Sequence, residues 1–154
     1  LNIDQGEAGA YIKTYFDRFP GIRTYMDRTK AEVRQAGFVS TVFGRRIHIP
    51  AIHSKSGAER QFGERAAINA PIQGAAADII RRAMIRMPAA IADLPARMLL
   101  QVHDELLFEV DEDAASTLTA RAKAVMEAAA HPAVAFKVPL IVEAGQGRTW
   151  AEAH

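Results

Sequence analysis

The chain has 154 residues, 49% of them hydrophobic, which is enough for one domain with a core and too short for two large ones. Its formal charge is only +1, and it contains no cysteine, which excludes a disulfide framework and a thiolate zinc site. The longest apolar runs have the length of strands and fall far short of the roughly 20 residues that a membrane-spanning helix needs. The chain opens on Leu1 without a methionine or an apolar leader, so we expect it to be the middle of a longer polypeptide.

Positive and negative side chains are divided unevenly along the sequence. Up to Arg65 there are eleven Lys and Arg against seven Asp and Glu, whereas from Met98 onward there are four against nine. A basic half and an acidic half suit a protein that holds a polyanion on one surface and a metal on another.

Two helices are predicted at the start of the chain. Asp4 begins a capping-box spacing, and apolar residues then recur every three or four positions up to Phe19. Pro20 ends this helix and lies in the first turn of a second one, which Gly37 is expected to end.

The hydrophobic period then changes from that of a helix to that of a strand. Residues 38–43 and 47–49 are rich in β-branched and aromatic side chains, and a tight turn is predicted at Gly44-Arg45 between them. Arg45 and Arg46 make this hairpin basic.

A helix is predicted to resume around Glu59 and to contain Pro71. Proline has no N–H and its ring crowds the preceding turn. We therefore expect either a kink at Pro71 or a break, followed by a second helix from Ile72 to Met87 that Pro88 ends.

Three polar residues of this region, Arg65, Asn69 and Gln73, are spaced at i, i+4 and i+8 and share one face if the helix is continuous. Their side chains can donate to acceptors on base edges, including the minor-groove acceptors that every base pair presents. A solvated helix face is the simpler alternative and stays open here. The small residues Ala66, Ala67 and Ala70 between them allow close approach of a partner.

The stretch from Met98 to Val110 has mostly apolar runs on both sides of His103-Asp104-Glu105, which predicts a hairpin with charged groups at its bend. Two adjacent carboxylates beside a histidine must be solvated, protonated or neutralised by a cation. A solvated acidic turn is the simpler alternative. The apolar strands favour a rigid presentation, which phosphoryl transfer with two Mg²⁺ ions about 3.5–4 Å apart requires.

His103 itself is a poor candidate for a zinc ligand, because there is no cysteine and the other four histidines are scattered. A hydrogen bond from His103 to a phosphate or sugar fits better, and a histidine packed on a strand remains an alternative. Beyond the hairpin we expect a helix that starts at residues 111–113, a buried strand at 138–144 and a tail anchored by Trp150.

Two motifs carry a resemblance to a known family, namely Gln101-Val102-His103-Asp104-Glu105 and residues 64–80, which read ERAAINAPIQGAAADII. Together with residues 25–30, residues 42–46 and the end of the chain from Gly145, they resemble the C-terminal end of the bacterial DNA polymerase I family, the family A DNA polymerases. The resemblance covers essentially the whole chain.

The resemblance implies template-directed DNA synthesis, in which the primer 3′-hydroxyl attacks the α-phosphate of a dNTP and pyrophosphate leaves. It implies that Asp104 binds the catalytic Mg²⁺ ions, two in the complete enzyme, that Glu105 is an auxiliary carboxylate, and that His103 lies near the primer terminus. It further implies a cytoplasmic, nucleoid-associated enzyme of DNA replication and repair that does not enter a membrane.

The same resemblance assigns the basic half of the chain to DNA. Arg65, Asn69 and Gln73 would contact the primer–template duplex along its minor groove and check the shape of base pairs. Arg45 and Arg46 would lie near the DNA backbone.

The expected fold is α+β, with an antiparallel palm sheet that contains the 98–110 hairpin and the 138–144 strand and is backed by helices. Residues 88–154 would be palm, and residues 1–87 would be helices from the fingers, a hairpin and the helix that contacts the duplex. The family's second metal-binding aspartate and the fingers helix that binds the dNTP are expected upstream of Leu1. We therefore expect the upstream part of the polymerase to be a partner, and the chain alone to be inactive and not to bind Mg²⁺ fully.

A non-catalytic DNA-binding or interaction module that keeps the palm fold is the alternative. A His-Asp metal phosphohydrolase is disfavoured, because it would need further histidines to converge on the site.

Overall fold

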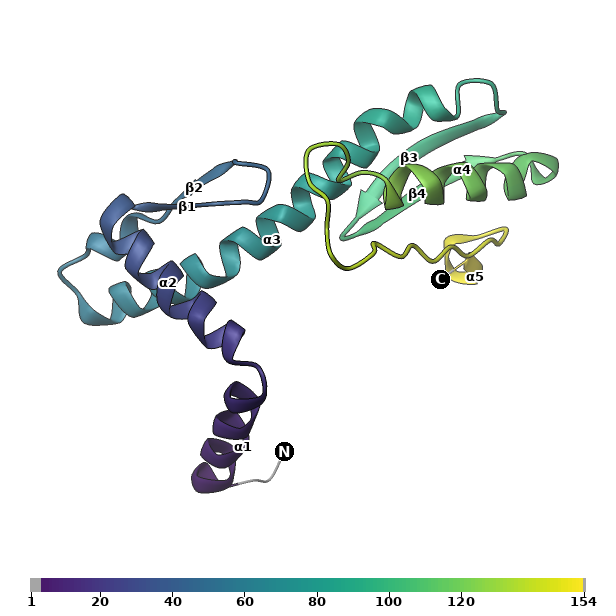
Figure 1. The fold of residues 1–154 in the computed structure, drawn as a ribbon. Helices are drawn as coiled ribbons and strands as arrows, with labels where there is room; N and C mark the ends of the chain where they lie inside the picture. Colours follow the sequence, from purple (N-terminus) through teal and green to yellow (C-terminus); the bar gives the residue numbers. More distant parts are fainter. Residues whose placement is uncertain (1–3, 154) are drawn as a thin grey trace. The chain divides into compact units, whose positions relative to one another are not determined.

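The computed structural model describes residues 4–153 and divides into two compact units, residues 1–72 and 73–154. Helices and two small antiparallel sheets, each of two strands, give the mixed helix-and-strand fold that the sequence predicts (Figure 1). Among residues 4–153, no helix combines the length and apolarity needed to cross a membrane.

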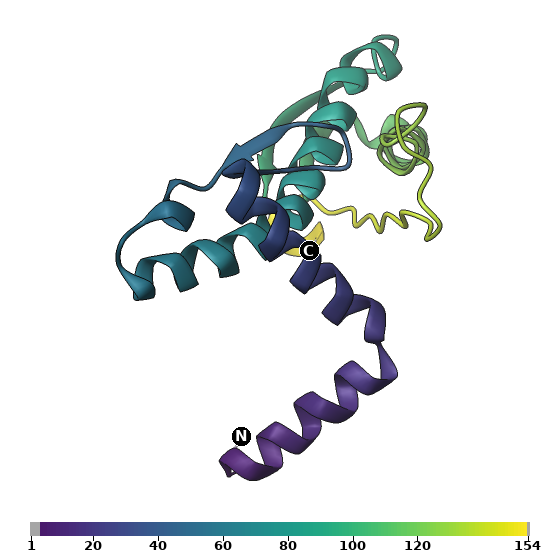
Figure 2. The ribbon, with the colours of Figure 1, turned by 60° about the vertical axis from the view of Figure 1, so that its left-hand side comes forward.

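The first unit opens with two helices whose predicted ends are confirmed. Helix α1, Gln5–Arg18, starts at Asp4, whose Oδ1 accepts hydrogen bonds from two backbone N–H groups at 2.7 and 2.9 Å. Helix α2, Pro20–Ala36, follows after a bend at Phe19 (Figure 2). It ends at Gly37, whose φ of 75° is unstrained only for glycine.

Strands β1, Phe38–Ser40, and β2, Arg46–His48, pair antiparallel as predicted, but the turn between them is longer than the predicted Gly44-Arg45 turn. The loop runs over residues 41–45 and is closed by Thr41, whose N–H donates to the Arg45 carbonyl at 2.9 Å. The hydroxyl of the buried Thr41 also accepts from the Arg45 N–H at 3.3 Å. This local hydrogen bonding holds a wider loop in place of a two-residue turn.

Helix α3, Gly57–Ala90, is unbroken, so of the two alternatives at Pro71 the break followed by a second helix from Ile72 is wrong. The predicted end at Pro88 is wrong as well. A helix can continue through a proline, with the loss of one internal hydrogen bond, where packing holds the segment before it. Ahead of Pro71, Ala67 is fully buried with Val33 and Ile52 in the core of the first unit. The short helix η1, Pro50–His53, lies so close to α3 that a side chain added at Gly63 would come within 3.0 Å of the Ile52 nitrogen.

In the second unit, β3, Ala96–Val102, and β4, Glu105–Val110, form the predicted hairpin. The acidic residues after it form a single 3₁₀ turn, η2 (Glu112–Ala114), before helix α4, Ala115–Glu127. Helix α4 lies along the hairpin (Figure 1), and the end of α3 completes a core centred on Met87, Ile91, Leu118 and Ala122.

The predicted strand at 138–144 is not formed. These residues have no regular structure, and Val138 and Ile141 are 73% and 79% exposed. A strand needs a neighbouring strand for its backbone hydrogen bonds, and here the Val142 N–H instead donates to Glu127 Oε1 at 3.2 Å. The chain then enters the short helix α5, Trp150–Ala153.

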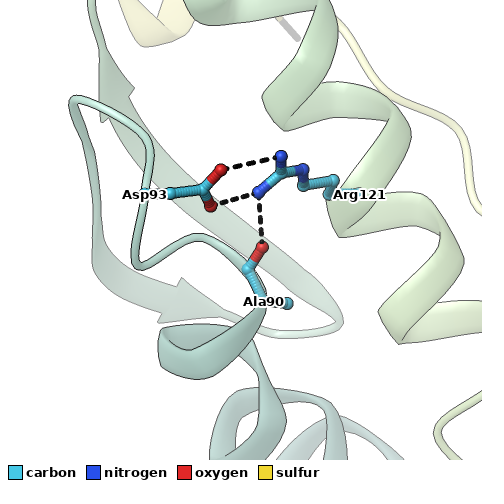
Figure 3. Close-up of polar contacts among 3 residues, drawn as sticks. All are labelled: Ala90, Asp93 and Arg121. Atoms are coloured by element: carbon cyan, nitrogen blue, oxygen red, sulfur yellow. Dashed lines mark hydrogen bonds and ion pairs between the residues drawn. The ribbon is translucent and has the colours of Figure 1, made fainter.

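A polar contact ties the end of α3 to α4 (Figure 3). Arg121 on α4 donates through Nη1 to the Ala90 carbonyl at 3.1 Å and through Nη2 to Asp93 Oδ2 at 3.0 Å, and Nη1 also bonds Asp93 Oδ1. Ala90 is the last residue of α3, so the guanidinium satisfies a carbonyl that the helix leaves without a partner.

Candidate functional site

The carboxylates of interest sit at a two-residue turn between β3 and β4. Val102 pairs with Glu105, so His103 and Asp104 are the two central residues of the bend. His103 has a φ of 51°, a left-handed conformation that residues other than glycine seldom adopt. The Gln101 side-chain amide donates to the His103 carbonyl at 2.7 Å and thereby braces the bend.

All three side chains of the His103-Asp104-Glu105 step are exposed. Glu105 starts β4 and lines a shallow hollow of about 20 Å³, which Leu106 and Trp150 also line. The Asp104 and Glu105 carboxylates are therefore exposed to solvent at the end of the hairpin. One face of that hairpin packs on α4.

These two carboxylates can form part of a metal site but do not complete one. Among residues 4–153, no three His, Asp or Glu side chains come together in a way that could hold a metal ion. Mg²⁺ takes oxygen ligands, keeps several waters, and is usually bound by one or two carboxylates together with substrate phosphates. Asp104 and Glu105 fit that role where other ligands complete the coordination shell.

On α3, the structure exposes all three polar residues that the spacing singled out. Arg65 and Asn69 are one helical turn apart on the part of α3 that belongs to the first unit, while Gln73 is on the part that belongs to the second.

Another side of this part of α3 is attached to α2. Arg34 Nη2 lies 2.5 Å from Glu64 Oε1. The hydrogen bond from Arg34 lowers the pKa of the Glu64 carboxyl, against the opposing effect of burial, and the charges of Arg34, Lys30 and Arg60 lower it further. The Arg65 and Asn69 side chains are thus displayed from a segment whose inner side is fixed.

Two residues that brace the site were not assigned a role from the sequence. One is Gln101, described above; the other is Tyr25 on α2, whose hydroxyl donates to the Ile68 carbonyl at 2.8 Å. A usable signal existed for Tyr25, because it precedes the buried Thr29 and Val33 by four and eight residues and so shares their helix face.

The basic residues of the first hairpin are also exposed. The Arg46 guanidinium lies over the Phe38 ring, 4.7 Å from its centroid, which orients the side chain and leaves its charge available to an anion. The first unit therefore carries Arg45, Arg46, Arg65 and Asn69, and the second carries Gln73, His103, Asp104 and Glu105.

A surface with exposed Arg and Asn side chains on a fixed helix and a turn with paired carboxylates are suited to handling a polyanion and a divalent cation. Comparison with known proteins shows which family the chain belongs to. Residues 1–152 match the family described as DNA polymerase family A, and the chain belongs to that family.

Two curated relatives extend this result. The chain is 52% identical over 158 residues to DNA polymerase I of Rhizobium leguminosarum, covering 100% of the chain and 16% of the relative. It is 49% identical over 156 residues to DNA polymerase I of Pseudomonas aeruginosa, covering 100% and 17%. The chain thus spans about a sixth of the length of these relatives.

A solved structure has the same fold. The POL domain of Pol1 from M. smegmatis, in complex with DNA primer-template and dNTP, matches with a TM-score of 0.89 and 46% identity over 98% of the chain and 26% of that domain's chain. Members of family A are DNA-directed DNA polymerases and generally use divalent metal ions.

Proposed function

We propose that this chain is the C-terminal, duplex-contacting and metal-binding part of a polymerase that carries out template-directed DNA synthesis. The observation that carries the proposal is the exposed Asp104-Glu105 pair at a braced two-residue turn, in a chain that matches family A over residues 1–152. The matching Pol1 domain, which was solved with primer-template DNA and dNTP, supports DNA and nucleotide as partners.

In this proposal Asp104 is the main protein ligand of the catalytic Mg²⁺, and Glu105 is an auxiliary carboxylate beside it. Bound Mg²⁺ supplies charge neutralisation on the triphosphate and activation of the primer hydroxyl. The hairpin positions Asp104, and His103 lies near the primer terminus, where it can donate a hydrogen bond to a phosphate or sugar. These residues position the reacting groups and perform no covalent chemistry.

The exposed residues of α3 contact the primer–template duplex in this proposal. Arg65, Asn69 and Gln73 donate to minor-groove acceptors that all base pairs share, so they respond to the shape of a pair more than to its sequence. Arg45 and Arg46 contribute charge toward the DNA backbone. In this scheme residues 1–87 belong to the fingers side and residues 88–154 to the palm.

The chain alone is proposed to be inactive. Asp104 and Glu105 do not complete a metal site among residues 4–153, and the matched relatives are about six times as long as this chain. The upstream part of the polymerase would supply a second aspartate and the helix that binds the dNTP. The joined protein would act in the cytoplasm, at the nucleoid.

Primer extension with Mg²⁺ tests this proposal, with the chain alone and with the chain joined to its upstream coding sequence. We expect extension only by the joined protein, and we expect Asp104→Ala to abolish it. Asp111→Ala is the matched control, since Asp111 is an exposed carboxylate in the same unit whose side chain caps no helix. Extension by the lone chain would refute the proposed incompleteness, and a fully active Asp104→Ala protein would refute the metal assignment.

One observation favours a second candidate function, a non-catalytic DNA-binding module. It is the lack of a group of three metal-ligating side chains among residues 4–153. If the joined protein binds primer–template DNA but does not extend the primer with any divalent metal, the module is the correct description.

A further inference from the structure

We propose that Tyr25 is a positioning residue for duplex recognition, because its hydroxyl holds the α3 turn that displays Asn69. This inference rests on the proposed contact between Asn69 and the DNA minor groove. It concerns a residue that would not touch DNA and that acts through the backbone beside Asn69.

The contact joins two helices far apart in the sequence. The phenolic O–H of Tyr25 on α2 donates to the carbonyl of Ile68 on α3, 43 residues later, at 2.8 Å. The hydrogen bond is partly buried. The distance is that of a good O–H···O bond, and partial burial shields it from competing water. Ile68 is the residue immediately before Asn69, so the bond acts on the backbone that carries the Asn69 side chain.

Pro71 makes an external hydrogen bond valuable at this turn of α3. Pro71 has no N–H, so the Ala67 carbonyl lacks the donor that it would find four residues on. The proline ring also crowds the Ala67 carbonyl and loosens the turn before it. The Tyr25 hydroxyl donates to the next carbonyl along, that of Ile68, and restrains the backbone beside the carbonyl that Pro71 leaves without its helical donor.

The other attachments of this segment lie on both sides of Ile68, and the later one is the apolar packing of Ala70 against the core of the first unit. Glu64 forms an ion pair with Arg34, and Ala67 packs in the core with Val33. Arg34 is 61% exposed, so that ion pair is open to solvent and screened by salt. Among residues 4–153, the Tyr25 bond is therefore the side-chain hydrogen bond that acts nearest to Asn69 along α3.

Rigid display of Asn69 matters most for discrimination. A donor that checks base-pair shape must reach its acceptor in a correct pair and fail to reach it in a distorted one. A mobile donor can form the hydrogen bond in both cases and so does not distinguish them. Loss of the Tyr25 hydroxyl should therefore reduce selectivity between matched and mismatched primer ends, with little effect on the rate at matched ends.

The test is Tyr25→Phe in the chain joined to its upstream polymerase sequence, which removes one oxygen and keeps the ring. We expect the ratio of kcat/KM for matched over mismatched primer termini to fall by about three- to tenfold, with kcat on matched termini changed by less than about twofold. Tyr11→Phe is the matched control, since Tyr11 is 68% exposed on α1, and it should leave the ratio unchanged.

A double-mutant cycle with Asn69→Ala separates positioning from a general loss of stability. We expect Asn69→Ala alone to lower the ratio and Tyr25→Phe to add nothing in that background. An unchanged ratio in Tyr25→Phe, or additive effects of the two substitutions, would overturn the positioning role while leaving the function of Asn69 intact. If Asn69→Ala itself leaves the ratio unchanged, the proposed duplex contact fails and this inference fails with it.

Discussion

Arg34 on α2 and Glu64 on α3 form an ion pair of 2.5 Å between residues thirty apart in the sequence, directly beside the exposed Arg65. The Arg34 hydrogen bond holds the pKa of Glu64 below its ordinary value of 4.5. A group whose pKa is lower in the folded than in the unfolded state stabilises the fold above its unfolded pKa, and that stabilisation is lost as the pH falls through the folded pKa.

Glu64→Gln should therefore lower the free energy of unfolding at neutral pH by about 0.2–1 kcal/mol, the range for a solvent-accessible ion pair. The difference in the free energy of unfolding between Glu64→Gln and the unsubstituted chain should shrink as the pH drops below 4.5. It should vanish once Glu64 is protonated and therefore as neutral as the glutamine. Urea unfolding at neutral and acidic pH measures this. Glu32→Gln serves as the control, because its partner Arg28 is 3.7 Å away on an exposed helix face, and a smaller loss is expected. An equal loss at every pH would show that charge pairing is not the cause.

Replacement of His103 by glycine should stabilise the β3–β4 turn. His103 has a φ of 51°, where a residue with a Cβ is strained by about 1 kcal/mol and glycine is not. We expect His103→Gly to raise the free energy of unfolding by up to about 1 kcal/mol and His103→Val, which is β-branched, to lower it. Urea unfolding of the three proteins compares them.

The same substitution would separate stability from function at this turn. In the joined polymerase, His103→Gly should reduce primer extension although the protein is more stable, because the imidazole is lost. If His103→Gly and His103→Val destabilise the chain equally, contacts of the imidazole and not backbone strain determine the residue at this position.

Local signals predicted the parts of the fold that local contacts form. The Asp4 cap, the Gly37 helix end and the hairpin around His103-Asp104 all depend on residues within a few positions of one another, and all are confirmed. One local feature was wrongly predicted, because hydrogen bonds of Thr41 hold a loop over residues 41–45 in place of the turn at Gly44-Arg45. The other errors lie elsewhere. Helix α3 continues through Pro71 in a segment packed against α2, and residues 138–144 have no neighbouring strand with which to pair.

The candidate site shows the same division. The sequence identified residues that the structure exposes on α3 and at the turn. It could do so because spacing and motif involve only residues close together along the chain. Their functional roles came from the family resemblance and remain predictions. The Tyr25 contact joins residues 43 apart, and no pattern within α2 names Ile68 as its partner.

The two classes of proposed DNA contact should respond differently to salt. Arg45 and Arg46 are exposed cations, and each one that neutralises a phosphate releases condensed counterions. Arg45→Ala or Arg46→Ala should each reduce the slope of log Kobs against log salt by about one, whereas Asn69→Ala should weaken binding with the slope unchanged. Fluorescence anisotropy with labelled primer–template DNA, across a range of salt concentrations, gives both quantities. A reduced slope in Asn69→Ala would place that residue among the charge-dependent contacts and contradict its minor-groove role.

The bond between Arg121 and Asp93 should make the second unit sensitive to acid (Figure 3). The Arg121 hydrogen bond, aided by a backbone hydrogen bond, lowers the pKa of Asp93 below its ordinary value of 3.8, and the same pair raises the pKa of Arg121. The contribution of the pair is therefore complete at neutral pH and is lost as the pH falls through the lowered pKa of Asp93. Asp93→Asn should lower Tm at neutral pH and have the same Tm as the unsubstituted chain in strong acid.

Arg121→Met should lower Tm more than Asp93→Asn at either pH, because it also leaves the Ala90 carbonyl at the end of α3 without its donor. Arg121→Lys should fall between them, since an ammonium group cannot bond the carboxylate and the carbonyl with the planar geometry of a guanidinium. Thermal unfolding followed by circular dichroism orders the three variants. Equal Tm values for Arg121→Met and Asp93→Asn would show that the carbonyl contact adds nothing to the ion pair.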